Sequence, residues 1–156
     1  MLNFARARKL PNQVGFNTCD AGELPFENGS VECIVSLRFF HLFRSAQRYV
    51  FTREFDRILR PGGHLICSFT NGWYLGGINF LCKAFGFRTV EFLYPGEMGR
   101  LFPGYEILAL RGNFLPFQWT TSLLGVKCES LSQWMTSRTT LNRVCWERYY
   151  LLRKPC

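Results

Sequence analysis

The sequence predicts an α/β fold in which parallel strands are followed by an antiparallel pair. Residues 31–37 and 64–70 are short apolar runs bounded by polar or glycine-rich segments, as in buried strands. A helical pattern separates them, and two strands joined by a helical crossover run parallel with a right-handed connection. Two later strand-like runs, 105–111 and 144–153, have no clear helix between them, which favours an antiparallel pair.

Composition limits the class of protein. The chain has 156 residues, 47% hydrophobic and 19% charged, which predicts one globular domain with a real core and excludes a disordered chain. Its net charge of +8 comes from scattered residues, so a solvated basic surface is favoured over a nucleic-acid partner. Sixteen phenylalanines indicate a ring-lined cavity, an apolar surface patch or a partner surface.

The seven cysteines form no C-x-x-C pair, and with two histidines they predict no metal site. Cys19, Cys33, Cys67 and Cys145 lie in or beside strand-like runs, so we expect them to be small buried hydrophobes in a reducing compartment. No apolar run has the length of a membrane span or follows the basic start as in a signal peptide. A cytoplasmic location is therefore expected.

The first half of the chain gives the clearest elements. We expect a short strand at Val14–Thr18, a loop over 20–30 with one helical turn at Gly22–Leu24, and a strand from Val31 covered on both faces. Ser45 is expected to cap the next helix, and Gly62-Gly63 to end it. The apolar stripe of this helix is formed by Phe51, Phe55, Ile58 and Leu59.

The remaining segments are expected as follows. Residues 2–9 look like the end of a helix, 74–87 like a helix weakened by two glycines, and 95–102 like a short helix. Residues 112–127 are irregular and 131–138 form a short helix. No internal repeat or linker is found.

Four motifs in order carry a family resemblance. They are Cys-Asp-Ala-Gly-Glu-Leu-Pro-Phe at 19–26, Ser-Val-Glu-Cys-Ile-Val at 30–35, Phe-His-Leu at 40–42, and the segment 54–63 that ends in Arg-Ile-Leu-Arg-Pro-Gly-Gly. Together they resemble the class I S-adenosylmethionine-dependent methyltransferases of the small-molecule type. The final Arg-Lys-Pro after an apolar strand is similar to a common ending in that family.

The resemblance implies a partial Rossmann-like methyltransferase sheet, with strands 3, 4 and 5 parallel and then an antiparallel 6/7 pair. It implies one partial domain over 1–156, with a cofactor-side core at 14–70, a substrate-side or cap region at 71–143 and a final strand at 144–155. The expected activity is methyl transfer from S-adenosylmethionine to a small-molecule acceptor. A non-catalytic truncated scaffold or interaction protein is the alternative, and a peripheral membrane protein is a third option.

The resemblance also implies which residues hold the cofactor. Asp20, with the backbone of Ala21, matches the acidic position that contacts adenine, and a carboxylate can accept from an exocyclic amine. An Asx turn is the competing interpretation of Asp20. Ser36, Leu37 and Arg38 end a strand at the carboxyl edge, where open α/β sheets place ligands, so they are candidates for the methionine side of the pocket.

Candidate residues for the acceptor are less specific. His41 is the one ionisable group near this edge with a near-neutral ordinary pKa, so it is a candidate general base, or else a hydrogen-bonding residue at a helix entry. The aromatic segments 73–87 and 114–119 are expected to form the acceptor wall, or to be ordinary core. Leu24 and Phe26 are expected near the base or in the core.

Two family motifs are missing from these 156 residues: the glycine-rich loop after the first strand and the acidic residue after the second. The chain resembles the family from the helix after strand two onward, so Val14–Thr18 must pair directly with the strand at 31–37, stay unpaired or find another chain. We therefore expect weak or no cofactor binding by this chain alone, and self-association through an unpaired sheet edge.

Overall fold

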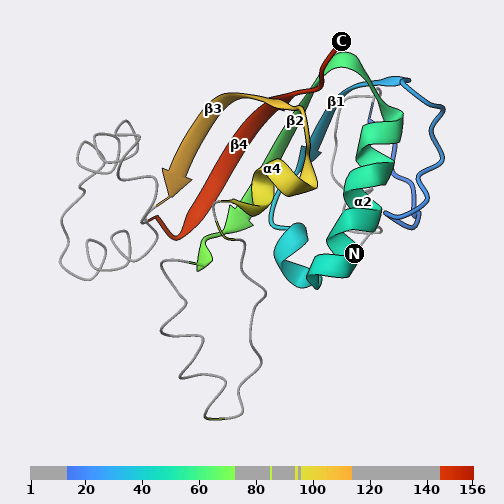
Figure 1. Cartoon of the computed structure of the whole chain (residues 1–156). Helices are drawn as coiled ribbons and strands as arrows, with labels where there is room; N and C mark the ends of the chain where they lie inside the picture. Colours follow the sequence, from blue (N-terminus) through green and yellow to red (C-terminus); the bar gives the residue numbers. More distant parts are fainter. Residues whose placement is uncertain (1–13, 73–84, 86–93, 95, 114–144) are drawn as a thin grey trace.

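The computed structural model describes residues 14–72, 85, 94, 96–113 and 145–156. Within these residues the chain forms a four-stranded mixed sheet with helices packed against it (Figure 1). The strands are β1 (Val31–Ser36), β2 (Leu59–Thr70), β3 (Glu106–Asn113) and β4 (Glu147–Arg153). The helices are the 3-10 turn η1 (Phe40–Leu42), α2 (Ser45–Ile58) and α4 (Glu97–Leu101).

The sheet order is β1-β2-β4-β3. β1 and β2 are parallel, with Ser36 beside Cys67, while β4 pairs antiparallel with both β2 and β3. The predicted fold class, parallel strands joined by a helix and followed by an antiparallel pair, is therefore confirmed. Both parallel strands end at the same edge, because the crossover through α2 returns the chain to its starting edge before β2 begins.

The core lies between the sheet and its helices. The predicted stripe of α2 is confirmed, since Phe51, Phe55 and Ile58 are all buried. They pack with α4 and with the inward residues of β2 and β4; the main members are Phe40, Leu65, Cys67, Phe69, Met98, Leu101, Phe102, Tyr150 and Leu152. α2 and α4 thus cover one face of the sheet.

The ends of α2 differ from the sequence-based expectation. Ser45 is the first helical residue rather than its cap; Arg44 occupies the cap position, and its N–H donates to the Gln47 side chain. The helix ends at Ile58, before Gly62-Gly63, because Leu59 already adopts an extended backbone that continues into β2. Gly62, with a φ of +70°, instead lies within β2 and donates to the carbonyl of Lys154.

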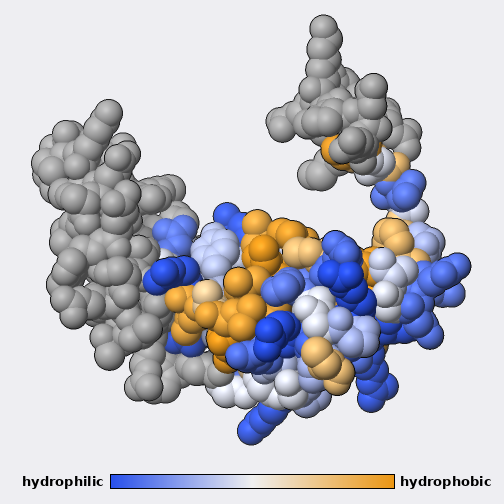
Figure 2. All heavy atoms as spheres, turned by 90° about the horizontal axis from the view of Figure 1, so that it is seen from above, coloured by the Kyte–Doolittle hydropathy of each residue, from blue (hydrophilic) through white to orange (hydrophobic). Residues whose placement is uncertain are grey.

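The N-terminal strand expected at Val14–Thr18 is wrong, since residues 14–19 form no strand and pair with nothing in the sheet. β1 is consequently an edge strand within the described part of the chain. Its outer face is open, with Val35 61% exposed, so the expected coverage on both faces is wrong there. Figure 2 shows hydrophobic side chains at the described surface among hydrophilic ones. Self-association through this edge stays a prediction.

Other expectations have mixed outcomes. The short helix expected at 95–102 and the two late strands are confirmed, although β3 continues to Asn113, into the segment expected to be irregular. Cys67 and Cys145 are buried as expected, whereas Cys19 and Cys33 are exposed, so the prediction is wrong for these two. In Gly22–Leu24 a turn and an isolated bridge replace the expected helical turn.

Several expected elements lie outside the described residues. These are the helices at 2–9, 74–87 (apart from Phe85) and 131–138, the aromatic segment 114–119, and most of the region 71–143. Among the residues that are described, no helix is long and apolar enough to cross a membrane.

Candidate functional site

The carboxyl ends of β1 and β2 form the first part of the site. Ser36 ends β1 and is buried, while Leu37, the next residue, is 49% exposed despite its apolar side chain. Arg38 then adopts a left-handed backbone with a φ of +54°, which is unusual for a residue other than glycine. The chain therefore turns sharply at this edge, where open α/β sheets bind their ligands.

A buried hydrogen-bond network holds this turn. The Arg38 N–H donates to Ser68 Oγ at 2.8 Å, and Ser68 Oγ donates to Glu147 Oε1 at 2.7 Å. The Tyr149 hydroxyl donates to Glu147 Oε2 at 3.0 Å. Glu147 is only 3% exposed. A buried carboxylate needs such partners, because leaving it without them would cost about 2–5 kcal/mol.

Sequence reasoning missed Ser68, Glu147 and Tyr149. A signal for Glu147 was present, because it is the one acidic residue in an otherwise apolar and basic run at 144–153. An acidic residue inside a strand that must be buried requires hydrogen-bonding partners nearby. Its partner Ser68 lies on β2, 79 residues away, and that pairing depends on the strand order.

His41 lies in η1 beside this network. Burial lowers the pKa of its imidazole, and the charge of Arg38 lowers it further; the carboxylate of Glu147 acts in the opposite direction. His41 Nδ1 is buried and has no hydrogen-bond partner among the described residues. The imidazole is therefore held uncharged near neutral pH, and one of its nitrogens is left for a partner that the described residues do not supply.

The loop at 20–24 forms the second part of the site. The Asp20 Oδ1 accepts a hydrogen bond of 2.8 Å from the Gly22 N–H, so the Asx turn considered for Asp20 is present. Ala21 and Leu24 pack against the core, whereas Phe26 is 47% exposed. Of the two expected positions, the core therefore holds for Leu24, which is partly buried, and not for Phe26; a position of Phe26 near the base stays a prediction.

The two parts meet at the ring of Phe51 in α2. The rings of Phe39 and Phe43, which follow the strand tip, lie 5.1 and 4.6 Å from the Phe51 ring between centroids. On the loop side, a methyl group built on Gly22 would come within 3.9 Å of Phe51 Cε1 and 3.2 Å of Val50 Cγ1. The structure thus brings the Asp20 loop and the segment that follows β1 together beside Phe51, near the middle of α2.

Glu54 and Arg57 of α2 fix the far side of the loop. Glu54 Oε1 accepts from the Leu24 N–H at 2.7 Å and pairs with Arg57 at 2.6 Å. The Arg57 guanidinium donates to the carbonyls of Leu24 and Phe26 at 3.0 and 2.8 Å. The Arg57 hydrogen bond is the main reason why the pKa of Glu54 lies below its ordinary value. One ion pair therefore holds both ends of the 24–26 segment on α2.

Residues 1–67 match the model of the methyltransferase domain family. This match covers all four motifs that carried the resemblance, together with β1, α2 and most of β2.

Solved structures match over more of the chain. One is a methyltransferase described as S-adenosylmethionine-dependent from Methanosarcina mazei, with a TM-score of 0.64 and 16% identity over 99% of this chain and 75% of that one. The chain has a class I methyltransferase fold. Another match is a putative methyltransferase from Haloferax volcanii, solved in complex with the Trm112 activator, with a TM-score of 0.66 and 17% identity over 100% of this chain and 68% of that one.

A third match, the geranyl diphosphate C-methyltransferase of Streptomyces coelicolor, was solved with S-adenosyl-L-homocysteine; its TM-score is 0.52, at 13% identity over 90% of this chain and 53% of that one. The resemblance to class I methyltransferases that the motifs predicted is confirmed. The chain spans 53 to 76% of the length of the methyltransferase structures from these species and from Mesorhizobium loti.

Proposed function

We propose that the carboxyl edge of β1 and β2 is the cofactor side of an S-adenosylmethionine-dependent methyltransferase that acts on a small-molecule acceptor. The observation that carries the proposal is that the Asp20 loop and the segment after β1 both lie beside Phe51, near the middle of α2. A ligand that spans these two segments would contact a carboxylate at one end and the turn at Leu37–Arg38 at the other.

The residues present suit part of the cofactor. Asp20 uses Oδ1 for its turn, which leaves Oδ2 to accept from an adenine amine, while Ala21 offers its backbone. The exposed Leu37 offers apolar surface to the methionine side, next to Ser36 and Arg38. The glycine-rich loop and the ribose-binding acid are not among the 156 residues, so the fit covers the adenine and methionine sides only.

When bound, S-adenosylmethionine supplies an electrophilic methyl group on a sulfonium centre. Positioning of the acceptor gives much of the rate enhancement in such a displacement. Where the acceptor carries a proton, His41 is the candidate base, and an uncharged imidazole with an unpartnered Nδ1 suits that role. His41 would take up the proton that the acceptor gives up when the methyl group leaves the sulfonium, which becomes a neutral thioether. Glu147, Ser68 and the Arg38 N–H hold the neighbouring turn in place.

A titration of the full chain with S-adenosylhomocysteine, followed by two-dimensional amide NMR up to millimolar concentration, tests the proposal. We expect weak, saturable shifts that centre on residues 20–22 and 36–38. Asp20→Asn keeps an oxygen for the Asx turn but replaces the free carboxylate oxygen with an amide donor. It should weaken binding about tenfold, the loss of roughly one charge-assisted hydrogen bond.

Glu27→Gln is the matched control, because it removes a carboxylate from the same loop at an exposed position. Its affinity should equal that of the unchanged chain. Saturable shifts elsewhere, or equal losses in the two variants, would contradict the proposed site. The absence of any shift at millimolar ligand would favour the non-catalytic scaffold instead.

A further inference from the structure

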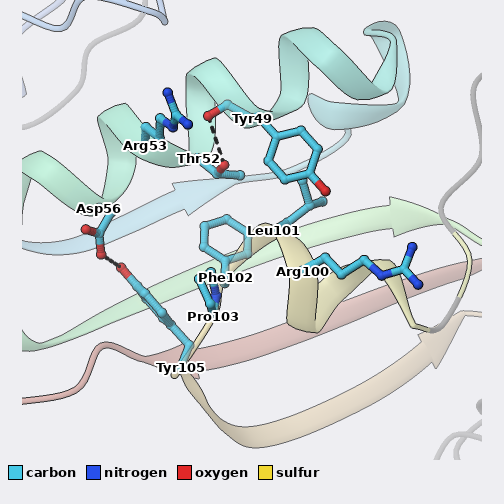
Figure 3. A pocket seen from close by; sticks show the side chains of 9 residues that line it. All are labelled: Tyr49, Thr52, Arg53, Asp56, Arg100, Leu101, Phe102, Pro103 and Tyr105. Carbon is cyan, nitrogen blue, oxygen red and sulfur yellow. Dashed lines mark hydrogen bonds between the residues drawn. The ribbon is translucent and has the colours of Figure 1, made fainter.

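A pocket of about 350 Å³ lies between α2 and α4, apart from the residues of the proposed cofactor site (Figure 3). This volume is in the range of small-molecule sites in proteins. The lining residues come from α2, from α4 and from the turn that leads into β3; they are Tyr49, Thr52, Arg53, Asp56, Arg100, Leu101, Phe102, Pro103 and Tyr105.

The polar groups at one end of the pocket are paired with each other. The Tyr105 hydroxyl donates to Asp56 Oδ1 at 2.9 Å, and Lys154 Nζ lies 3.4 Å from the same oxygen. Burial and this contact with the carboxylate raise the pKa of the Tyr105 hydroxyl. In Figure 3 the Asp56–Tyr105 pair closes the end of the pocket nearest the C-terminal end of α2. The negative charge of Asp56 is therefore compensated before any ligand enters.

The other end has polar groups without partners. Tyr49 and Arg100 lie at this end in Figure 3, Tyr49 reaching from α2 toward α4. Arg53 projects from α2 at the rim. Within the described part of the chain, none of the three side chains makes a hydrogen bond or ion pair; all three are exposed. With Asp56 paired to Lys154, the pocket has an uncompensated positive charge.

The floor of the pocket is apolar. Leu101 and Phe102 are 5% and 3% exposed and belong to the core, so they form a fixed wall. The ring of Phe102 is itself held edge-on by the ring of Tyr105, with 5.4 Å between centroids. The Thr52 hydroxyl has no proton left to donate to a ligand, because it donates to the Tyr49 carbonyl at 3.2 Å.

We propose that this pocket binds a small aromatic carboxylic acid. The ring of such a ligand packs on Leu101 and Phe102, and its carboxylate accepts hydrogen bonds from Arg100 and from the Tyr49 hydroxyl. A guanidinium and a phenol match the acceptor oxygens of a carboxylate, and the charge-assisted bonds are the stronger kind. The site would be distinct from the proposed cofactor edge, and the inference does not depend on the proposed function.

The test uses the full chain with two probes of the same shape, 2-naphthoate and the neutral 2-naphthamide, in amide NMR titrations. We expect saturable shifts at residues 49–56 and 100–105 with the acid, at a Kd on the order of 1 mM or below, given the usual affinity per ligand atom. The amide should bind about tenfold more weakly, because it lacks the charge that Arg100 recognises.

Arg100→Gln should weaken binding of the acid about tenfold and leave the amide unchanged. Arg111→Gln is the control, since it removes the same charge from β3. The side chain of Leu110 packs toward the core, and side chains alternate between the two faces of a strand, so Arg111 lies on the sheet face away from α4. Equal affinity of both probes, equal effects of both variants, or shifts centred outside the pocket would overturn the proposal. If Arg100→Gln unfolds the chain, Tyr49→Phe takes its place, because it removes only an unpaired hydroxyl. A lower affinity of this variant for 2-naphthoate would support the proposal, and an unchanged affinity would oppose it.

Discussion

Ser68 Oγ accepts the Arg38 N–H at 2.8 Å and so joins two residues that are 30 positions apart. Arg38 has a left-handed backbone, which costs a residue with a side chain about 1 kcal/mol or more. This hydrogen bond offsets part of that strain, and Ser68 is itself held by the bond that it donates to Glu147. Ser68 and Glu147 therefore act as positioning residues for the sheet edge where the cofactor is proposed to bind.

The first prediction concerns Ser68→Ala. Removal of this hydroxyl leaves the Arg38 N–H and Glu147 Oε1 without their hydrogen bonds at a buried position, so we expect the free energy of unfolding to fall by about 1–3 kcal/mol. Urea unfolding followed by circular dichroism measures it. Ser30→Ala removes an exposed hydroxyl that donates to the Glu27 carbonyl, and it should change the value by less than about 0.5 kcal/mol. Equal losses would contradict the assigned role of Ser68.

The second prediction is a pH dependence that comes from Glu54. The Arg57 hydrogen bond lowers the pKa of Glu54 in the folded chain below its ordinary value of 4.5. The resulting stabilisation is complete above that unfolded value and is lost as the pH falls through the lower, folded pKa. Glu54→Gln should therefore destabilise the chain at pH 7, and its difference from the unchanged chain should shrink toward pH 3.

Urea unfolding at several pH values gives this difference. Glu23→Gln, which changes an exposed residue of the neighbouring loop, is the control and should follow the unchanged chain. A constant difference between Glu54→Gln and the unchanged chain from pH 7 to pH 3 would show that the ion pair with Arg57 does not act as described.

The third prediction concerns the protonation of His41. Burial and the nearby Arg38 charge lower its pKa, so an NMR titration of the ring protons should give a value below 6.5. Since the unfolded chain takes up this proton first, stability is complete above pH 6.5 and declines as the pH falls through the folded pKa. His41→Gln should remove that part of the decline. His64→Gln leaves one imidazole in the chain and assigns the signal.

The nitrogen spectrum of the same sample reports the tautomer. A buried N–H without a partner is rarer than a buried unpaired acceptor, so we expect the proton on Nε2 and a lone pair on the unpartnered Nδ1. That is the state able to accept a proton from a methyl acceptor. A titration midpoint above 6.5, or a proton on Nδ1, would argue against His41 as the base.

Local patterns in the sequence predicted most of the described fold. The spacing of Phe51, Phe55 and Ile58 identified α2 and the face that it buries, and the apolar runs identified β1 and β2. The strand expected at Val14–Thr18 is wrong because alternation alone does not make a strand. Its backbone needs a neighbour, and among the described residues β1 pairs only with β2.

The candidate site was less predictable, and the reason lies in sequence separation. Asp20 and Ser36 could be named as candidates because each lies in or next to a local motif, and their roles stay predictions. Glu147 meets Ser68 only because β4 inserts beside β2, with Thr70 opposite Glu147. Similarly, the pocket at Tyr49 and Arg100 depends on the packing of α4 against α2, and no short sequence motif predicts that packing. Contacts between distant segments require the fold before they can be inferred.

The fourth prediction concerns Gly63, which the sequence indicated as a helix stop and the structure places inside β2. A methyl group built on Gly63 would lie 2.8 Å from the Arg60 carbonyl oxygen, 2.9 Å from Leu59 Cγ and 3.0 Å from the Glu32 carbonyl oxygen. Two of these atoms belong to backbone and cannot move aside cheaply. Gly63→Ala should therefore lower the free energy of unfolding by about 1–3 kcal/mol, because the two parallel strands must separate locally.

Gly99→Ala is the matched substitution in open space, since nothing lies within 4 Å of a methyl group built there. In the middle of α4, alanine should raise the free energy of unfolding by about 0.5–1 kcal/mol, because it restricts the unfolded chain and favours the helix. Thermal and urea unfolding of the two variants should thus shift in opposite directions. A neutral Gly63→Ala would mean that β1 and β2 are not in close contact at Glu32, and hence that the edge built on their ends is wrongly placed.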